Sequence, residues 1–377
     1  MRSVESIPVL ENIPVLVRAA LNVPIKDGKV SGAFRLRQAL RTIEYLRMRH
    51  ARVVLIGHIG DKGTETLMPV YEAMKEWVPG LQFCPVTTGP KAREAVRSLS
   101  PGGVLMLENL RRYRGEKENS EAFSHELAEL ADVFVQDSFD VCHRAHASVV
   151  GVSDILPSYA GFLVIDEVQA LTKALKPASP SLAIIGGAKF STKQPVLKKL
   201  LTSYNHVFVG GALANDFMQA QGLPVGTSLV SNASKEDLLP LLQSKKLLLP
   251  VDYVVAPKNG AFSERRVCGV EEVRSEEAIL DNGPETIAML SQYVHKAKTV
   301  LWNGPLGNYE NGFHEGTEAL AQVIAHAKVR SIIGGGDTVA AIERLRLNDR
   351  MSFISTGGGA MLDFLAKGTL PGLAALD

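Results

Sequence analysis

The chain has 377 residues, of which 46% are apolar, so it is long enough for about two domains with cores of their own. Its 41 basic and 40 acidic residues give a formal net charge of +1, which disfavours a general attraction to nucleic acid or to an acidic membrane. Cys84, Cys142 and Cys268 are too widely spaced for a disulfide framework, and no stretch predicts a membrane span or a signal peptide. We therefore expect a soluble cytoplasmic protein without nucleic-acid or membrane partners.

Short β-branched runs alternate with helical patterns along the chain. The predicted strands cover residues 14–21, 52–58, 103–109, 133–139, 181–187, 206–212, 253–257, 299–305, 331–337 and 352–359. Helical segments such as 34–50 and 120–131 separate most of them. This alternation predicts an α/β fold in which parallel sheets carry helices on both faces. The mostly apolar strands agree with burial on both sides.

A domain boundary is predicted where Pro177, Ser179 and Pro180 end a helix that runs from about Phe162 to Leu175. The strand that follows opens a second α/β unit. We therefore expect two doubly wound domains, at residues 1–160 and 177–365, joined by a helix at residues 161–176.

Arginine and lysine are distributed unevenly. Of 21 arginines, 14 lie in residues 1–150, whereas 14 of the 20 lysines lie after residue 150. Arginine suits bidentate recognition of carboxylate or phosphate, while lysine acts as a compact point charge. Two halves that hold different anions would explain this pattern, and chance placement on solvated faces would explain it as well.

The second half repeats one device, in which a strand is followed by glycines and then by a helix. It occurs at "IIGGAK", "VFVGGAL", "LWNGPLG", "IIGGGDT" and "ISTGGGA". Such turns let backbone N–H groups approach a ligand, and the helix that follows presents its positive end. Their repetition favours a phosphate-bearing ligand over plain packing. The chain lacks the P-loop pattern and the GxGxxG dinucleotide pattern, which argues against both classes.

Several charged residues stand beside these glycines. Lys189 and Lys193, four residues apart, would share a helix face near its N-terminus and repel each other unless phosphates lie between them. Asp337 follows three glycines and could hold Mg²⁺, or cap the next helix, or do both. Glu310 could bond a ribose. The alternatives are solvated lysines and an ordinary surface glutamate.

The stretch "CHRAH" places Cys142, His143, Arg144 and His146 within five positions. A metal site would need further ligands at suitable spacing, and a Cys–His nucleophile pair would need sequence neighbours to meet in space. An anion-binding role fits best, because His143 and Arg144 follow a predicted strand in the arginine-rich half. His146 would orient its neighbours, and Cys142 would fill space.

Taken together, the motifs resemble those of the phosphoglycerate kinases. They are "RAALNVP", "GHIG", "LENLR", "HRAHAS", "GGAKFSTK", "LDNGPETI", "WNGPLGNYE", "IIGGGDT", "STGGGA" and "LPGLAALD", in the family's order and roughly its spacing. The resemblance implies two Rossmann-like domains that face each other across a cleft, with a tail at residues 366–377 that returns to the first. It further implies a monomer that transfers a phosphoryl group reversibly and directly between 1,3-bisphosphoglycerate and ADP, giving 3-phosphoglycerate and ATP, after hinge closure.

The resemblance also implies roles for individual residues. Six match the side that binds the acid: Asn22, Arg35, His58, Arg111, His143 and Arg144. Twelve match the side that binds ADP or ATP: Gly187, Lys189, Lys193, Gly211, Asn303, Pro305, Glu310, Gly334, Asp337, Thr338, Gly357 and Gly358. The transferred group would be contacted by Arg35, Lys189, Gly335 and Gly336, and Mg²⁺ by Asp337.

Among the positions that depart from the family pattern, two bear directly on acid binding. Ala20 stands where the family has an aspartate that bonds the substrate, and Asp61 stands where it has an arginine that helps to hold the substrate phosphate. Arg112 or Lys62 could compensate for Asp61. The alternatives to a working kinase are therefore a weakened or inactive nucleotide-binding homologue and a kinase for a different small carboxylate.

Overall fold

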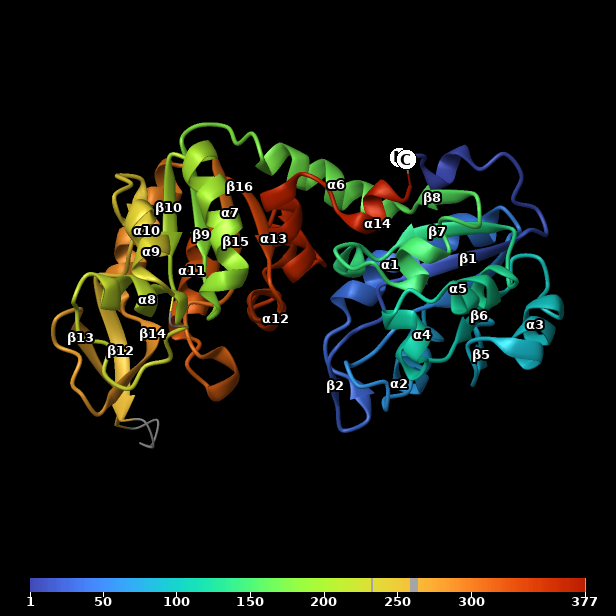
Figure 1. Cartoon of the computed structure of the whole chain (residues 1–377), viewed down its shortest axis with the longest axis horizontal. Coiled ribbons are helices and arrows are strands. Elements are labelled where there is room, and N and C mark those ends of the chain that lie inside the picture. Colours follow the sequence, from blue (N-terminus) through green and yellow to red (C-terminus); the bar gives the residue numbers. More distant parts are fainter. Residues whose placement is uncertain (232, 258–263, 377) are drawn as a thin grey trace. The chain divides into compact units, whose positions relative to one another are not determined.

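The computed structural model describes residues 1–231, 233–257 and 264–376 (Figure 1). The chain forms two compact units, Met1–Gln169 together with the tail from Lys367, and Ala170–Ala366. The division between them falls inside helix α6 (Phe162–Ala174). Residues 232, 258–263 and 377, which belong to the predicted second domain and tail, lie outside the described residues. No helix of the described ranges is both long and apolar enough to cross a membrane.

A six-stranded parallel sheet organises the first unit, with the order β5–β6–β4–β1–β7–β8. Its strands are β1 (Pro14–Ala19), β4 (Arg52–Ile56), β5 (Gln82–Cys84), β6 (Val104–Leu107), β7 (Val133–Asp137) and β8 (Ser158–Ala160). Four of these are the predicted strands. The sequence-based prediction missed β5 and β8 because three residues are too few to show a pattern.

Helices cover both faces of this sheet, because successive side chains of a strand point to opposite sides. Val15 and Val17 of β1 pack in one core with residues of α1 (Phe34–Met48) and α2 (Met68–Met74), whereas Leu16 packs in another with residues of α3 (Gly89–Arg97) and α5 (Glu121–Ala128). The unit also contains α4 (Arg114–Lys117) and the hairpin β2 (Ile25–Lys26)–β3 (Lys29–Val30).

The chain's tail belongs to the first unit. Helix α14 (Pro371–Ala374) lies against the segment that follows β7, where Gly372 N donates to Cys142 O at 2.8 Å. A Cβ at Gly372 would lie 2.6 Å from Cγ1 of Val149, so this contact leaves no room for a larger residue. Cys142 is fully buried at the contact, as expected for a residue that fills space.

A second six-stranded parallel sheet organises the second unit, with the order β11–β10–β9–β15–β16–β17. Its strands are β9 (Ser181–Ile185), β10 (His206–Val209), β11 (Leu247–Leu248), β15 (Thr299–Asn303), β16 (Arg330–Gly334) and β17 (Phe353–Ile354). The helices are α7 (Phe190–Ser203), α8 (Leu213–Ala220), α9 (Lys235–Leu242), α10 (Pro284–Lys296), α11 (Glu315–His326), α12 (Gly336–Arg344) and α13 (Gly358–Lys367). The predicted α/β class with two parallel sheets is confirmed.

One predicted strand has a different setting. Residues 253–257 fall in β12 (Asp252–Pro257), which belongs to an antiparallel sheet with β13 (Arg266–Gly269) and β14 (Glu277–Asn282) on either side. The connections between these strands are too short for the crossover that parallel pairing requires. The expectation that this strand joins a parallel sheet was wrong, since an apolar run carries no information on strand direction.

We expect the Trp302→Ala substitution to lower the free energy of unfolding by about 3–5 kcal/mol. Trp302 lies in β15, is fully buried, and donates from Nε1 to Gly304 O at 2.9 Å. Denaturant titration followed by circular dichroism would measure the loss. The control is Leu239→Ala on α9, where the side chain is 47% exposed and the change should stay within about 0.5 kcal/mol. Equal losses from both variants would contradict this assignment of the core.

Candidate functional site

The predicted acid-binding residues follow four neighbouring strands of the first unit. Asn22 comes after β1, His58 after β4, Arg111 after β6, and Arg144 after β7. Because β6, β4, β1 and β7 are adjacent and parallel, their carboxyl ends lie at one edge of the sheet. This edge is where ligands of open α/β sheets bind.

His58 lies at the centre of this group. It is 3% exposed, and its pKa is held well below the usual range, first by burial and then by the positive charges of Arg18, Arg111, Arg144 and Arg35. Four guanidinium groups therefore gather around one imidazole, which stays neutral near neutral pH. The arrangement favours an anion, since it concentrates four positive charges around one side chain.

Arg18 is the residue of this group that the sequence analysis missed. It lies within β1 and is 1% exposed; Nε donates to Ser148 Oγ at 3.0 Å and Nη1 to Ala19 O at 2.9 Å. Its Nη2 lies 2.9 Å from His58 Nδ1. Arginine can only donate, so Nδ1 accepts and the proton of neutral His58 resides on Nε2. A single charged residue inside an otherwise apolar strand was the available signal.

A buried carboxylate balances part of this charge. Glu116 is 1% exposed and accepts bonds from the N–H and the hydroxyl of Ser148, at 3.0 and 2.7 Å. Burial would raise its pKa, but the bonds from His146 and Ser148 and the charge of Arg18 outweigh burial and hold the pKa low. His146 Nδ1 lies 3.6 Å from Glu116, which fits the predicted orienting role.

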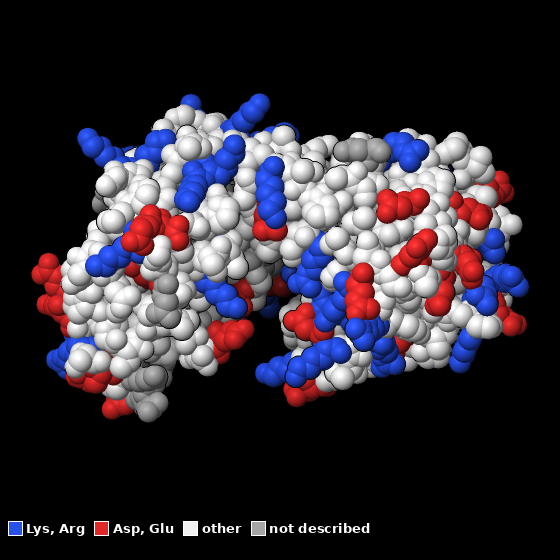
Figure 2. All heavy atoms as spheres, viewed as in Figure 1, with Lys and Arg blue, Asp and Glu red and all other residues white. Residues whose placement is uncertain are grey.

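The remaining predicted residues join the group through short contacts. Arg35 Nη1 donates to Asn22 O at 2.7 Å, and Asn22 Oδ1 accepts from Gly60 N at 3.1 Å. Arg144 Nε donates to His143 Nε2 at 3.3 Å, so these neighbours form one half-buried polar unit. Figure 2 shows lysine and arginine side chains gathered over the region of β2, α2 and α4, with some carboxylates among them.

The departures at residues 20 and 61 have different consequences. Ala20 is fully buried and leaves no polar group where an aspartate was expected. Asp61 forms an ion pair with Arg111, one of the predicted acid-binding residues. Arg112, which could compensate for Asp61, pairs with Glu108 at 3.4 Å.

The second unit contains a pocket of about 380 Å³, within the usual range for small-molecule sites. Its lining comes from the turns after β9 and β10, the end of β14, the loop after β15, and the start of α12. Five predicted nucleotide residues line it: Gly187, Gly211, Pro305, Glu310 and Asp337. The glycine turns therefore do border a cavity.

At two of these positions the backbone conformation requires glycine. Gly187 has a φ of +92° and Gly211 a φ of +63°, conformations that side chains rarely allow. A Cβ at Gly211 would lie 2.8 Å from Gly187 N, so the two turns touch backbone to backbone. A Cβ at Gly187 would lie 3.3 Å from Lys193 Nζ, which places that amine over the turn.

The two predicted lysines begin helix α7. Lys189 is its N-cap residue and Lys193 lies in the first turn. Burial first, and then the charge of Lys189, lower the pKa of Lys193. The lysines are thus close enough to repel each other at the positive end of a helix, where an anion would be stabilised.

Asp337 lies in the first turn of α12, after Gly335, whose φ is +99°. Burial and then the charge of Glu310 raise the pKa of Asp337. Across the described ranges, no group of three or more His, Cys, Asp or Glu side chains could hold a metal by itself. Mg²⁺ that arrives with nucleotide phosphates needs only one or two carboxylates, so Asp337 fits a contact to MgADP or MgATP.

The other predicted residues lie outside the pocket lining. Asn303 Nδ2 donates to Gly358 O at 3.3 Å, and a Cβ at Gly334 would lie 3.1 Å from the same Nδ2. Thr338 is fully buried, and its Oγ1 has no hydrogen-bond partner among the described residues. These contacts connect the loops that follow β15, β16 and β17. Lys189, Lys193 and Gly357 also lie outside the lining.

The comparisons with known proteins agree over nearly the whole chain. Residues 5–368 match the sequence model of the family described as phosphoglycerate kinase. The phosphoglycerate kinase of Roseiflexus sp. (strain RS-1) is 43% identical over 377 residues, which cover 96% of this chain and 95% of the relative. That of Moorella thermoacetica is 43% identical over 385 residues, or 97% of both chains. This chain belongs to the phosphoglycerate kinase family.

Solved structures support the same conclusion. The phosphoglycerate kinase from Pyrococcus horikoshii OT3 matches with a TM-score of 0.89 and 31% sequence identity, over 100% of this chain and 98% of that one. The one from Coxiella burnetii matches with a TM-score of 0.82 and 36% identity, over 99% and 98%. The family prediction and the expected phosphotransferase with a carboxyl acceptor are confirmed.

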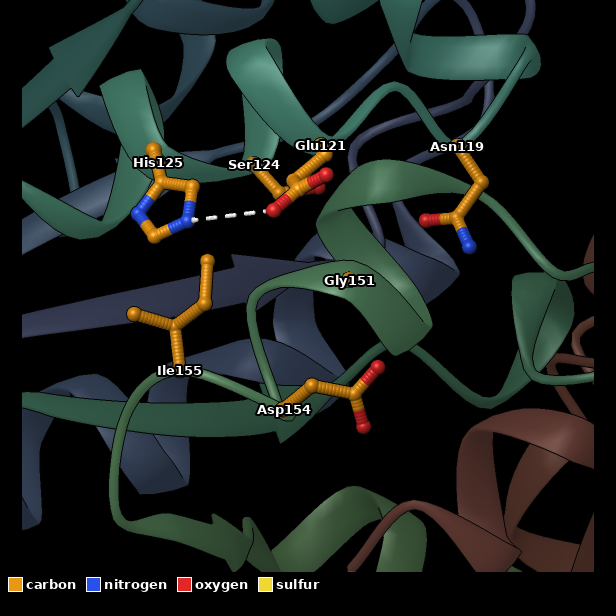
Figure 3. A pocket seen from close by; sticks show the side chains of 7 residues that line it. All are labelled: Asn119, Glu121, Ser124, His125, Gly151, Asp154 and Ile155. Atoms are coloured by element: carbon orange, nitrogen blue, oxygen red, sulfur yellow. Dashed lines mark ion pairs between the residues drawn. The ribbon is translucent and has the colours of Figure 1, made fainter.

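A separate hollow of about 590 Å³ lies in the first unit (Figure 3). Its lining includes Glu121, His125 and Asp154, and His125 Nε2 lies 4.0 Å from Glu121. The predicted acid-binding residues do not line it. Its two carboxylates would repel an anionic acid, so the arginine group remains the candidate site.

We expect His58 to remain neutral to well below pH 6.5, with its proton on Nε2, because burial and four arginines disfavour the imidazolium. Two-dimensional ¹H–¹⁵N spectra of imidazole-labelled protein would show the Nε2–H tautomer and its titration. The Arg18→Met variant should raise the pKa of His58. An Nδ1–H tautomer in the parent protein would contradict the contact with Arg18.

Proposed function

We propose that this chain catalyses the reversible transfer of a phosphoryl group between 1,3-bisphosphoglycerate and ADP, giving 3-phosphoglycerate and ATP. The proposal rests on two candidate anion sites of different chemistry. One is a group of arginines around a neutral histidine, and the other is a glycine-lined pocket next to two lysines. Family membership supplies the reaction that such a pair of sites would serve.

The first unit is proposed to hold the acid. Arg35, Arg111 and Arg144 would donate to its carboxylate and phosphate, since guanidinium groups match the geometry of both. Neutral His58 would donate from Nε2 without adding charge. Asn22 and His143 would complete the set. Support comes from the clustering of these side chains at one edge of the sheet.

The second unit is proposed to hold MgADP or MgATP. Gly187 and Gly211 would let the nucleotide approach the backbone, and Pro305 and Glu310 would border the sugar. Lys189 and Lys193 would neutralise phosphate charge. Asp337 would contact the Mg²⁺ that accompanies the nucleotide. The loops with Asn303, Gly334, Thr338, Gly357 and Gly358 would fix the position of the terminal phosphate.

Transfer itself is proposed to rest on position and charge. In phosphoryl transfer the protein neutralises negative charge and aligns the two oxygens, so no protein nucleophile is needed. Arg35 and Lys189 would reach the transferring group from opposite sides, and backbone N–H groups of Gly335 and Gly336 would add bonds. Closure of the two units would exclude water, which otherwise accepts the phosphoryl group.

The protein is proposed to act as a cytoplasmic monomer without nucleic-acid or membrane partners. The balanced formal charge of +1 argues against a general attraction to polyanions. The three cysteines are free and buried, as suits a reducing compartment. Light scattering of the purified protein would give its mass in solution.

We expect the parent protein to turn over ATP with 3-phosphoglycerate, and Arg35→Gln or Lys189→Met to lower kcat by about 10²-fold or more, because each removes a charge from the transferring group. A coupled assay that consumes 1,3-bisphosphoglycerate would measure kcat of the parent and of each variant. The matched control is Lys199→Met on the exposed face of α7, which should leave kcat unchanged.

A parent protein that binds nucleotide but shows no turnover at millimolar 3-phosphoglycerate would refute the proposed reaction. It would support the inactive nucleotide-binding homologue instead. Turnover restricted to another small carboxylate would support the third alternative, a kinase for that acid.

We expect the affinity for MgADP to fall on acidification. The pKa of Asp337 is raised, so its carboxylate becomes protonated at a higher pH than an ordinary aspartate and loses its attraction for Mg²⁺. Calorimetry at decreasing pH would follow this loss. Asp337→Asn should bind MgADP weakly at every pH, whereas the exposed control Asp349→Asn should behave like the parent. An unchanged pH profile in Asp337→Asn would contradict the contact.

A further inference from the structure

Asp61 and Arg111 form an unequal ion pair in the first unit. The Arg111 side chain is 2% exposed, whereas that of Asp61 is 86% exposed. Arg111 Nη1 also donates to Gly60 O at 2.5 Å. The buried cation therefore takes its acceptors from two adjacent residues of one loop, and one of these acceptors is a charged carboxylate that faces solvent.

This difference in burial makes Asp61 a replaceable counter-ion. A buried guanidinium needs an acceptor at all times, because an unpaired buried charge is costly. An exposed carboxylate gains little from the pair and is fully hydrated when it turns away. An anionic ligand that offers more charge and more acceptor oxygens can thus take Arg111 from Asp61.

The backbone of this loop leaves Asp61 near the site even after such an exchange. Gly63 has a φ of +76°, and a Cβ there would lie 2.0 Å from Arg111 O, so the loop lies directly against the backbone of Arg111. Lys117 Nζ donates to Asp61 O at 2.5 Å and gives the loop a second contact. The side chain can rotate, but its negative charge stays close to any ligand on Arg111.

We propose that Asp61 is a specificity-determining residue, which lowers the affinity of the first unit for phosphorylated acids by competing for Arg111. Binding of a phosphate dianion is then an exchange of one anion for another, followed by repulsion from the displaced carboxylate. An acid without a phosphate is attracted less strongly to Arg111 and is repelled less strongly by Asp61. Asp61 therefore reduces the ratio of the affinity for 3-phosphoglycerate to the affinity for glycerate. This inference rests on the proposed acid site.

The test is calorimetric binding of 3-phosphoglycerate and of glycerate to the parent, Asp61→Asn and Asp132→Asn. Asp61→Asn keeps the size of the side chain and removes the competing charge, so 3-phosphoglycerate should bind about 3- to 10-fold more tightly. Glycerate should change by less than about twofold. Asp132→Asn removes the same charge from an exposed position before β7 and should change neither acid.

Unchanged or weaker binding of 3-phosphoglycerate to Asp61→Asn would overturn the proposal, because Asp61 would then be idle or would position Arg111 for the ligand. Equal gains for both acids would also overturn it, since the effect would be general electrostatics. In an Arg111→Met background, the gain from Asp61→Asn should disappear if the two residues act through each other. Its persistence there would count against the proposal.

These binding measurements are independent of turnover. If the parent binds 3-phosphoglycerate and Asp61→Asn raises that affinity, but the parent transfers no phosphoryl group, only the proposed function is refuted. If the parent turns over 3-phosphoglycerate but Asp61→Asn leaves its affinity unchanged, only this inference is refuted.

Discussion

A hydrogen bond between two buried side chains, Arg18 Nη2 and His58 Nδ1, determines the character of the first-unit site. It fixes the imidazole as neutral and places its proton on Nε2. Arg18 donates to Ser148, and Ser148 donates to Glu116. These buried hydrogen bonds fix the position of Arg18 behind His58. Arg35, Arg111 and Arg144 add positive charge around His58, which suits a small molecule with several negative charges.

The second unit also has features that suit an anion, but they are of a different kind. Its glycine turns remove side chains, so backbone groups and helix ends can face a ligand. Lys189 and Lys193 repel each other at one such helix end, which leaves the site short of negative charge. In the proposed function, one half would therefore recognise an anion through rigid side chains, and the other through backbone groups and point charges. The uneven distribution of arginine and lysine in the sequence agrees with this division.

The sequence predicted the class of fold and the residues near each site, because strand runs, glycine turns and motif order are local features. It did not predict the antiparallel setting of residues 253–257, since direction depends on the length of the connections on either side. Arg18 was missed because its partners, His58 and Ser148, lie 40 and 130 positions away. The pairing of Arg111 with Asp61 and of Arg112 with Glu108 could not be predicted either, because spacing does not show which carboxylate each arginine reaches.

The return of the tail to the first unit has a consequence for biosynthesis. Gly372 fits tightly against Cys142 and Val149, beside the segment that carries His143 and Arg144. The half of the protein that leaves the ribosome first is therefore the last to be completed. Until residues 371–374 emerge from the ribosome, the second unit can fold while the segment after β7 still lacks the packing of Gly372 against Cys142 and Val149. Folding of the first unit is therefore completed only when residues 371–374 dock, although most of this unit precedes the second unit along the chain.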